Sequence, residues 1–490
     1  MISVSPITIA AFCLYLTIVV AIAVVAYMKT KNLSDFVLGG RSLSGPVAAL
    51  SAGASDMSAW LFFGLPGAVF ALGLNQIWYP IGLTVGAYCS WRFIAKPLRV
   101  FSEIANDSLT VPAFLDNRFF DNSGILRVIF AIVTLIFFAF YTASGLVAGA
   151  VLLQRFGLNY TESLLLGTTI IMGYTLVGGF LAVSWTDFFQ GSLMLCCMLI
   201  VPVVAMLELG GAHPTLGLIK EVGEHLVDPF HNFNILLFVN LVSWGLGYLG
   251  QPHILVRYMA VKTLTDIPLA RRVCVSWMSL SMLGAVLIGF VGIAYFQAKG
   301  MDPQSVFVMF SEALFSPWLA GLLFAAILSS VMCAIDSQML ASSSALTEDL
   351  YHRLLRKKAS QKELVWVGRI SLLLIGAVAL SLASVPNNKI IDLVAFAWAG
   401  LASAFGPCVV LSLFWPRMTR NGAIAGVLFG AFTVIIWYFL HGGIFDLYEI
   451  IPGFITGTLA VVITSLLDKP PSKKITDQFN LAWAKISQNT

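Results

Sequence analysis

Long apolar runs separated by short polar segments fill most of the chain. At roughly 20 residues per membrane-spanning helix, these runs predict about thirteen spans. The expected spans cover residues 7–28, 45–71, 74–95, 127–153, 163–184, 188–208, 233–256, 274–297, 317–348, 366–385, 390–415, 421–440 and 451–467. The pattern therefore predicts an all-α polytopic membrane protein, with a single transmembrane domain over residues 1–468 and a polar tail over 469–490.

The second apolar run is interrupted by a polar stretch, Ser51 to Trp60, which reads SAGASDMSAW and contains Asp56. A charged side chain at the centre of a bilayer costs about 3 kcal/mol or more, so this stretch must face protein or water. One interpretation is a broken helix whose freed carbonyls and hydroxyls hold an ion or a small substrate. The alternative is a contact between helices through small residues, with Asp56 bound to a neighbouring donor.

A second interruption lies at Trp244 to Pro252, which reads WGLGYLGQP. Pro252 has no N–H and frees a carbonyl one turn earlier, while glycine permits unwinding or close approach. Trp244 and Tyr248 share one helical face, and such aromatics suit a small zwitterion with an apolar ring. A kinked structural helix is the alternative. Paired breaks at matching places point to inverted repeats, here expected over about 45–208 and 233–415.

A third polar segment is SSVMCAIDSQMLASSSALTED, within the ninth predicted span. Ser329, Ser330, Cys333 and Asp336 recur at a spacing that places them on one helix face. Hard cations prefer several oxygen ligands. This face and the carbonyls of the first break could together supply them. The alternative is hydrogen bonding between helices by small polar residues.

Composition agrees with a membrane protein, because 59% of the residues are hydrophobic and 11% are charged, against about 25% charged in soluble domains. If the first span runs from outside to inside, only four of the 28 Lys and Arg fall outside: Arg155, Lys220, Lys299 and Lys389. The rule that cytoplasmic loops are rich in Lys and Arg then places the N-terminus outside and the C-terminus inside. Basic loops next to the membrane also make lipid an expected partner.

Several classes of function are disfavoured. We find no nucleophile–base pair, cofactor motif or P-loop, so neither an enzyme nor an ATP-driven pump is expected, and nucleic acid is not an expected partner. The seven cysteines fall in or beside apolar runs, which predicts no disulfide framework. Three histidines in the segment 209–232 are irregularly spaced, so a solvated loop is favoured over a transition-metal site.

Several longer motifs extend the interpretation. They are LGGRSLSGPVAALSAGASDMSAW, GLPGAVF, GGFLAVSWTD, WGLGYLGQPHIL, SALTEDLY, SQKELVWVGR, WPRMTRNGA and YEIIPGF. From about Lys31 to Phe454 the chain resembles the sodium:solute symporter family. The resemblance implies a LeuT-like fold, with two inverted five-helix repeats and extra helices, in a bacterial inner membrane, with a periplasmic N-terminus and a cytoplasmic C-terminus. It also implies alternating-access uptake of L-proline driven by an inward gradient of sodium, with no further cofactor.

The resemblance also implies site residues. The sodium site would use the main-chain carbonyls of Ala54, Met57 and Ser330 and two side-chain positions, Cys333 and Ala334, with the carboxylates of Asp56 and Asp336 nearby. The proline pocket would comprise Trp60, Tyr141, Trp244, Tyr248 and Pro252. Coupling and gating would involve Arg41, Ser51, Ser55, Ser58 and Asp187, the last as a carboxylate in an inner loop.

The chain departs from the family pattern at the two positions that should supply hydroxyl ligands, Cys333 and Ala334. A thiol is a soft, weak ligand for a hard cation, and a methyl group is none. Three hypotheses follow: a sodium-coupled proline symporter with an altered site, a proton-coupled symporter of proline or a related small amino acid using Asp56 or Asp336, and a proline sensor without transport. The absence of a signalling domain in the sequence disfavours the sensor.

Overall fold

The computed structural model describes residues 5–28, 37–297, 301–385 and 390–488. Throughout these residues the chain is helical, apart from turns and one isolated bridge between Leu43 and Val261. Four lysines used in the charge argument, Lys29, Lys31, Lys299 and Lys389, lie outside the described residues. The all-α prediction is confirmed for the described part of the chain.

Nine helices in the described residues are long and apolar enough to cross a membrane, and two bent pairs raise the number to as many as 11. The straight ones are α1 (Pro6–Tyr27), α8 (Ile125–Leu153), the part of α9 (Tyr160–Glu208) from Gly179 onward, α13 (Ile267–Phe296), α15 (Pro317–Ser344), α16 (Gln361–Ala383), α17 (Ile390–Phe414), α18 (Arg420–Tyr438) and α19 (Ile450–Leu467). The bent pairs are α3 (Gly45–Asp56) with α4 (Gly64–Leu72), at 75°, and α11 (Ile235–Ser243) with α12 (Pro252–Ala260), at 45°.

The expected number of thirteen spans is not confirmed, because two of them are helical but are not among these eleven. Residues 74–95 belong to α5 (Trp78–Cys89), a π-helical turn and α6 (Ala95–Ile104), where Arg92 and Lys96 interrupt the apolar run. Residues 163–184 begin in the first part of α9, which contains several Thr and Gly residues. Both segments combine helical structure with a weaker apolar pattern.

The sequence prediction placed a loop between residues 184 and 188, and this was wrong. The helix α9 changes direction earlier, at Gly179, whose φ of 63° and ψ of −166° are not helical. Glycine tolerates this positive φ because it has no Cβ. Asp187 therefore lies within a helix and is fully buried, so it is not an inner-loop carboxylate.

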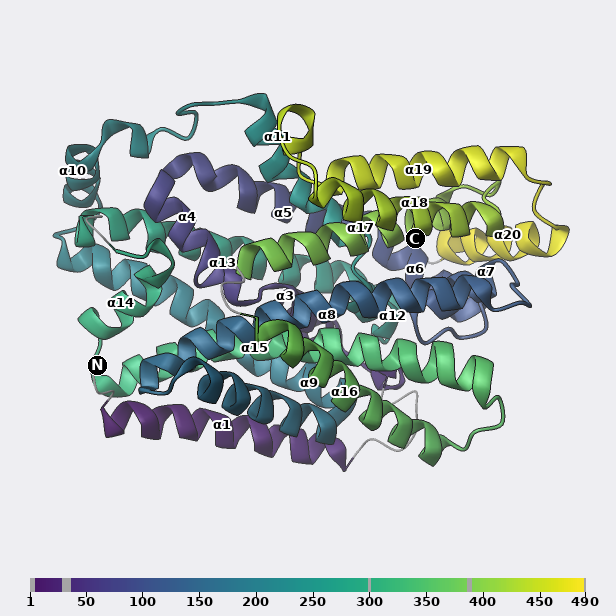
Figure 1. The fold of residues 1–490 in the computed structure, drawn as a ribbon, viewed down its shortest axis with the longest axis horizontal. Coiled ribbons are helices and arrows are strands. Elements are labelled where there is room, and N and C mark those ends of the chain that lie inside the picture. Colours follow the sequence, from purple (N-terminus) through teal and green to yellow (C-terminus); the bar gives the residue numbers. More distant parts are fainter. Residues whose placement is uncertain (1–4, 29–36, 298–300, 386–389, 489–490) are drawn as a thin grey trace.

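The helix α15 runs through the middle of the molecule, as Figure 1 shows. Its most apolar stretch is 83% buried inside the protein, because α1, α3, α8, α9 and α16 all pack against it. The helices α17, α18 and α19 pack on one another on the other side of α8. The polar segment of α15 is thereby kept away from lipid.

Shorter helices cover the ends of the molecule: α7 (Val111–Arg118), α10 (Ala212–Val222), α14 (Val306–Leu314) and α20 (Lys473–Gln488). The helix α20 buries Ile475, Phe479 and Ala482 against the rest of the protein, and Lys485 Nζ lies 2.9 Å from Glu103 Oε1. The sequence predicted a polar tail over 469–490, and its described part forms an amphipathic helix that packs against the rest of the protein.

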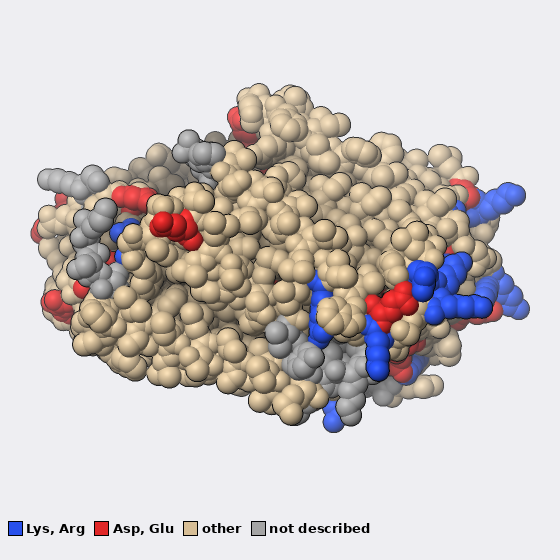
Figure 2. All heavy atoms as spheres, turned by 60° about the horizontal axis from the view of Figure 1, so that its bottom comes forward, with Lys and Arg blue, Asp and Glu red and all other residues tan. Residues whose placement is uncertain are grey.

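Charge is distributed unevenly over the molecule. Figure 2 shows Lys and Arg gathered at one end of the visible face, while Asp and Glu predominate at the other. The basic end is the one at which α20 lies in Figure 1, and α1 begins at the opposite end. The start of α1 and the helix α20 thus lie toward opposite ends of the helical body.

Candidate functional site

The break between α3 and α4 removes the hydrogen-bond partners of two carbonyl groups. Ser58 N–H bonds to Asp56 O at 2.8 Å, and Leu61 N–H bonds to Ser58 O at 3.0 Å. In a continuous helix these two N–H groups would instead bond to the carbonyls of Ala54 and Met57. The break therefore leaves both carbonyls free of their helical partners, in the protein interior.

The two interrupted helices meet at Asp56. The break in the second pair is a 3₁₀ segment, Trp244–Leu249, between α11 and α12. Its Tyr248 hydroxyl donates a hydrogen bond to Asp56 Oδ2, and Trp60 Nε1 donates to Asp56 O at 3.2 Å. Asp56 is 1% exposed. The carboxylate thus links the two breaks to each other, away from lipid.

Two glycines in the second break allow other helices to approach closely. A Cβ on Gly245 would collide with the backbone of Gly82 in α5, and one on Gly247 would collide with the indole of Trp398 in α17. Trp398 Nε1 also donates to the carbonyl oxygen of Trp244 at 2.9 Å. The unwound segment is therefore supported by packing on both sides.

A cavity of about 370 Å³ lies beside this junction, and we refer to it as the aromatic cavity. Its lining residues are Trp60, Gly64, Leu65, Gly67, Ala68, Gln76, Tyr79, Leu241, Trp244, Asp302, Pro303, Gln304 and Ile391. The ring centroid of Tyr79 lies 5.4 Å from that of Trp60 and 5.0 Å from that of Trp244. Of the five residues expected in the proline pocket, Trp60 and Trp244 line this cavity.

The other three expected pocket residues do not line the aromatic cavity. Tyr141, in α8, is 1% exposed, and its ring lies 6.5 Å from that of Trp398. Tyr248 packs edge-on against the same Trp398, at 5.5 Å. Pro252, the first residue of α12, does not line the aromatic cavity and borders a second cavity described below.

The polar face of α15 is directed mainly toward α9 and α1. The Cys333 thiol donates to Gln190 Oε1 at 3.0 Å, and Gln190 Nε2 donates to Tyr15 OH at 2.6 Å. Asp336 Oδ1 accepts a hydrogen bond from Thr175 Oγ1 at 2.6 Å. Among the described residues, neither the Cys333 nor the Asp336 side chain bonds to α3.

The remaining expected cation-site residues are all buried in the same region. Ser330 turns its hydroxyl back to Ile327 O at 2.7 Å, while its carbonyl lies within the continuous helix α15. Ala334 is 1% exposed. A helical carbonyl keeps a second lone pair after its intrahelical bond, so Ser330 remains able to act as a ligand.

A buried ion pair joins four helices next to this region. Asp187 Oδ2 accepts a hydrogen bond from Ser51 Oγ at 2.6 Å and lies 3.5 Å from Arg257 Nη2. The same Arg257 nitrogen donates to Ser337 Oγ at 2.5 Å, and Nη1 donates to His253 O at 2.6 Å. Burial of charges is costly unless they are paired and hydrogen-bonded. Arg257 and Asp187 Oδ2 are paired and hydrogen-bonded, while Asp187 Oδ1 has no partner among the described residues. The network ties α3, α9, α12 and α15 together.

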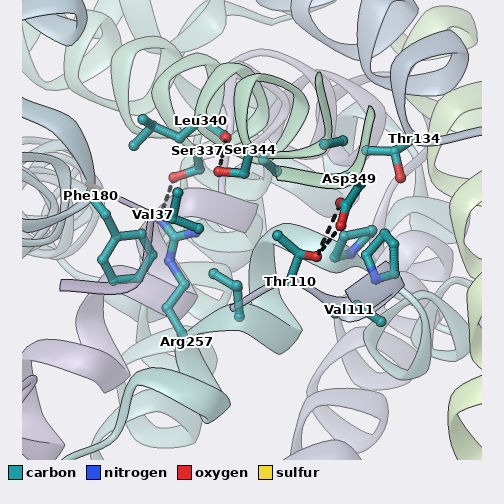
Figure 3. Close-up of a pocket in the computed structure, with 15 residues that line it drawn as sticks. Val37, Thr110, Val111, Thr134, Phe180, Arg257, Ser337, Leu340, Ser344 and Asp349 are labelled. Carbon is teal, nitrogen blue, oxygen red and sulfur yellow. Dashed lines mark hydrogen bonds between the residues drawn. The ribbon is translucent and has the colours of Figure 1, made fainter. Parts of the chain in front are cut away.

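Arg257 also lines a second cavity, of about 30 Å³, which we refer to as the polar cavity (Figure 3). Its lining residues are Val37, Thr110, Val111, Pro112, Thr134, Phe180, Pro252, Val256, Arg257, Ser337, Leu340, Ala341, Ser344, Ala345 and Asp349. Figure 3 shows Arg257 and Ser337 on one side and Asp349 on the other, with Thr110 Oγ1 bonded to the Asp349 carboxylate at 2.9 and 3.0 Å. This volume has room for water but not for an amino acid.

The expected coupling residues separate into groups. Ser51 belongs to the Asp187 network, Ser55 bonds to Ala52 O in its own helix, and Ser58 is 3% exposed within the first break. Arg41 lies elsewhere, where its Nε donates to Asp107 Oδ1 at 2.7 Å and its Nη1 donates to Met259 O at 2.6 Å.

Sequence reasoning missed Tyr79, Gln190, Thr175 and Arg257 as members of this region. Each is a single polar or aromatic residue in or beside an apolar run, and its partners lie far away in the sequence, as the 143-residue separation of Gln190 and Cys333 illustrates. The detectable signal was the cost of an ionisable group in a span. It applies to Arg257, which lies two residues after the end of the motif WGLGYLGQPHIL.

Comparison with known proteins identifies similar sequences over almost the whole chain. A model of the sodium:solute symporter family matches residues 36–430. The sodium/proline symporter of Salmonella typhimurium is 48% identical, over 96% of this chain and 95% of that protein. The high-affinity proline transporter of Bacillus subtilis is also 48% identical, over 94% of this chain and 98% of that protein.

Solved structures with the same fold have much lower sequence identity. A Na⁺-coupled sialic acid symporter, solved in a substrate-bound outward-open state, superposes with a TM-score of 0.82 at 18% identity, covering 96% of this chain and 100% of that one. A nucleobase-cation-symport-1 family transporter superposes with a TM-score of 0.53 at 14% identity, covering 92% of this chain and 99% of that one. These similarities concern the fold.

Proposed function

Because the chain belongs to the sodium:solute symporter family, we propose that it imports L-proline together with sodium. It is a multi-pass membrane transporter with a LeuT-like fold rather than an enzyme. The observation that carries the proposal is 48% identity to proline transporters over nearly the full length of both chains. The junction of the two interrupted helices at Asp56 supports it, since such breaks hold substrate and ion in transporters of this kind.

Proline would bind at the inner end of the aromatic cavity. The cavity volume of about 370 Å³ is within the range typical of small-molecule sites. Trp60 and Trp244 offer ring faces to the pyrrolidine ring and its ammonium group, which aromatic faces attract. Tyr141 and Tyr248 would close the pocket against Trp398. Pro252 would act on the backbone by breaking the helix rather than by touching proline.

Sodium would bind between α3 and α15. The free carbonyls of Ala54 and Met57, with the carbonyl of Ser330, supply oxygen ligands, and Asp56 supplies negative charge nearby. Cys333 and Ala334 add no hard ligand, since the thiol is bonded to Gln190. We therefore expect a weaker sodium site than one with two hydroxyls. The names of the relatives favour sodium over the proton alternative.

The two cavities are consistent with alternating access. The aromatic cavity leads to the site from one side, while the polar cavity is closed by the Ser51–Asp187–Arg257–Ser337 network on the other. Sodium would stabilise the state in which α3 and the second break form the pocket, so that sodium and proline each favour the binding of the other. A membrane potential of about 100 mV contributes about 2.3 kcal/mol to the entry of one charge.

We infer the orientation of the protein in the membrane from the distribution of Lys and Arg, and the two repeats from the positions of the two helix breaks. The end rich in Lys and Arg would be cytoplasmic, which places α20 and the C-terminus in the cytoplasm and the N-terminus in the periplasm of a bacterial inner membrane. The repeats would cover about 45–208 and 233–415, each with one interrupted helix near its start. The polar cavity then lies on the cytoplasmic side.

The test is uptake of radiolabelled L-proline into proteoliposomes, with a sodium gradient and a proton gradient imposed separately. The expected result is accumulation driven by the sodium gradient and enhanced by an inside-negative potential. Uptake driven only by protons would replace sodium with the proton alternative. Binding of proline without uptake under either gradient would favour the sensor.

A further inference from the structure

The aromatic cavity contains a tyrosine that sequence reasoning did not single out. Tyr79 lies in α5, between the two interrupted helices, and its ring contacts Trp60 on one side and Trp244 on the other. The geometry is edge-on in both cases, with interplanar angles of 67° and 82°. Tyr79 is thus the residue of α5 that contacts the aromatic side chains of both breaks.

The hydroxyl of Tyr79 has no hydrogen-bond partner among the described residues, although the residue is only 8% exposed. Buried polar groups without a partner are uncommon in folded proteins, because the lost hydration is not replaced. The neighbouring hydroxyls are used differently: Tyr248 OH bonds to Asp56, and Tyr448 OH bonds to Ala395 O at 2.8 Å. Tyr79 therefore keeps an unpaired, buried donor beside the cavity that its side chain lines.

This donor lies close to the junction at which the substrate is expected. The Tyr79 ring contacts Trp60, whose indole N–H donates to the Asp56 carbonyl oxygen, and Trp244, which precedes Tyr248 in the second break. The Asp56 carboxylate already accepts a hydrogen bond from the Tyr248 hydroxyl. An anionic substrate group near Asp56 would need a donor of its own to balance the repulsion between the two carboxylates.

We propose that Tyr79 is a substrate-binding residue whose hydroxyl donates a hydrogen bond to the carboxylate of the bound amino acid. This inference rests on the proposed function. The donor selects amino acids with a free carboxylate, while Trp60 and Trp244 contact the apolar ring. Occupancy by the substrate would satisfy the Tyr79 hydroxyl, which has no hydrogen-bond partner among the described residues.

The variant Tyr79→Phe tests this directly, because it removes a single oxygen that forms no hydrogen bond with any described residue. A hydrogen bond to a charged group contributes enough that its loss should raise the KM for L-proline about tenfold or more at saturating sodium. Uptake into proteoliposomes and the thermal stability of the purified transporter should be measured together. Stability should be unchanged or slightly higher, since the unpaired hydroxyl is gone.

Competition with L-proline methyl ester, in which the carboxylate is neutralised, locates the contact. The wild-type protein should favour L-proline over the ester, and Tyr79→Phe should reduce this preference by about the factor by which KM rises. A reduced preference for L-proline over cyclopentanecarboxylate, which lacks the ammonium group, would instead place the hydroxyl on the amine and overturn the proposal.

The matched control is Tyr174→Phe, which alters a tyrosine in α9 that is also buried and whose hydroxyl also lacks a described partner. Tyr174 does not line the aromatic cavity, so the KM of the Tyr174→Phe variant for proline should equal that of the wild type. Equal KM values for Tyr79→Phe and the wild type would refute the inference while leaving proline transport intact. Absence of proline uptake by the wild type would refute the proposed function itself.

Discussion

The aromatic cavity and the polar cavity lie on opposite sides of the same junction and are built differently. The first has a volume of about 370 Å³ and is lined mainly by aromatic, aliphatic and small residues. The second has a volume of about 30 Å³ and is bordered by Arg257 and Asp349, with their hydrogen-bond partners. Of these two cavities, the first has room for an amino acid and the second does not.

The difference shows how one helix bundle provides a binding site and a barrier together. Aromatic rings give contact area with little loss of side-chain entropy and leave space between them. A buried ion pair gives little net stability, but breaking it by removing one partner is costly. The barrier is therefore sensitive to the loss of one charge, while the site is sensitive to the loss of one ring.

The largest expected effect comes from removing the charge at the barrier. Arg257→Ala leaves Asp187 buried beside Ser51 without its cationic partner, and such losses cost about 3–5 kcal/mol. We expect a clear fall in thermal stability and in the amount of transporter in the membrane, measured by fluorescence-detected gel filtration after heating. The exposed Arg272→Ala is the control. Failure of a second change, Asp187→Asn, to recover part of the loss would contradict this account.

At the site, Trp244→Ala should be the next largest change. Its ring stacks on Tyr448 at 4.9 Å and contacts Tyr79 at 5.0 Å, so its loss opens the aromatic cavity. Truncation of a central Trp at a binding site costs about 2 kcal/mol or more, so the KM for proline should rise by about thirtyfold. The control is the exposed Trp366→Ala in α16. An unchanged KM at normal expression would remove Trp244 from the pocket.

The third change affects the cation rather than the substrate. Asp56→Asn keeps an oxygen that can accept the Tyr248 hydrogen bond but removes the negative charge, which attracts a cation in the protein interior. The sodium concentration for half-maximal proline uptake should rise by about tenfold, since about 1.4 kcal/mol corresponds to a factor of ten. The exposed Asp392→Asn should leave it unchanged. Equal sodium titration curves for both variants would exclude Asp56 from the cation site.

Much of the fold was predictable, because it is determined by apolar length and by local breaks. The runs around Asp56 and Pro252 contain the Gly, Ser and Pro residues that interrupt a helix, and the structure bends at both. The turn in α9 was predicted several residues too late, because Gly179 breaks the helix within an apolar run. Periodicity in a wholly apolar segment does not indicate where the direction changes.

Site residues were predictable where a polar or ionisable side chain stands out within its own apolar run. Asp56 and Trp60 are unusual within their run, and the structure brings both to the junction. Asp336 was expected near the cation, but its carboxylate bonds to Thr175, which only the packing of α15 on α9 determines. Contacts between helices that are distant in the sequence depend on how each helix is rotated about its own axis. A single sequence does not specify this rotation.

The smallest expected effect concerns the two positions at which the chain departs from its family. Cys333→Ser with Ala334→Thr restores two hydroxyls on α15, which are harder ligands than a thiol and a methyl group. Each new oxygen should contribute about 1 kcal/mol or less, because the hydroxyl that replaces the Cys333 thiol would still be drawn toward Gln190. The sodium concentration for half-maximal uptake should fall by about fivefold, with the KM for proline little changed. Cys408→Ser, at another buried cysteine, is the matched control. An unaltered sodium response in the double variant would place the cation elsewhere than between α3 and α15.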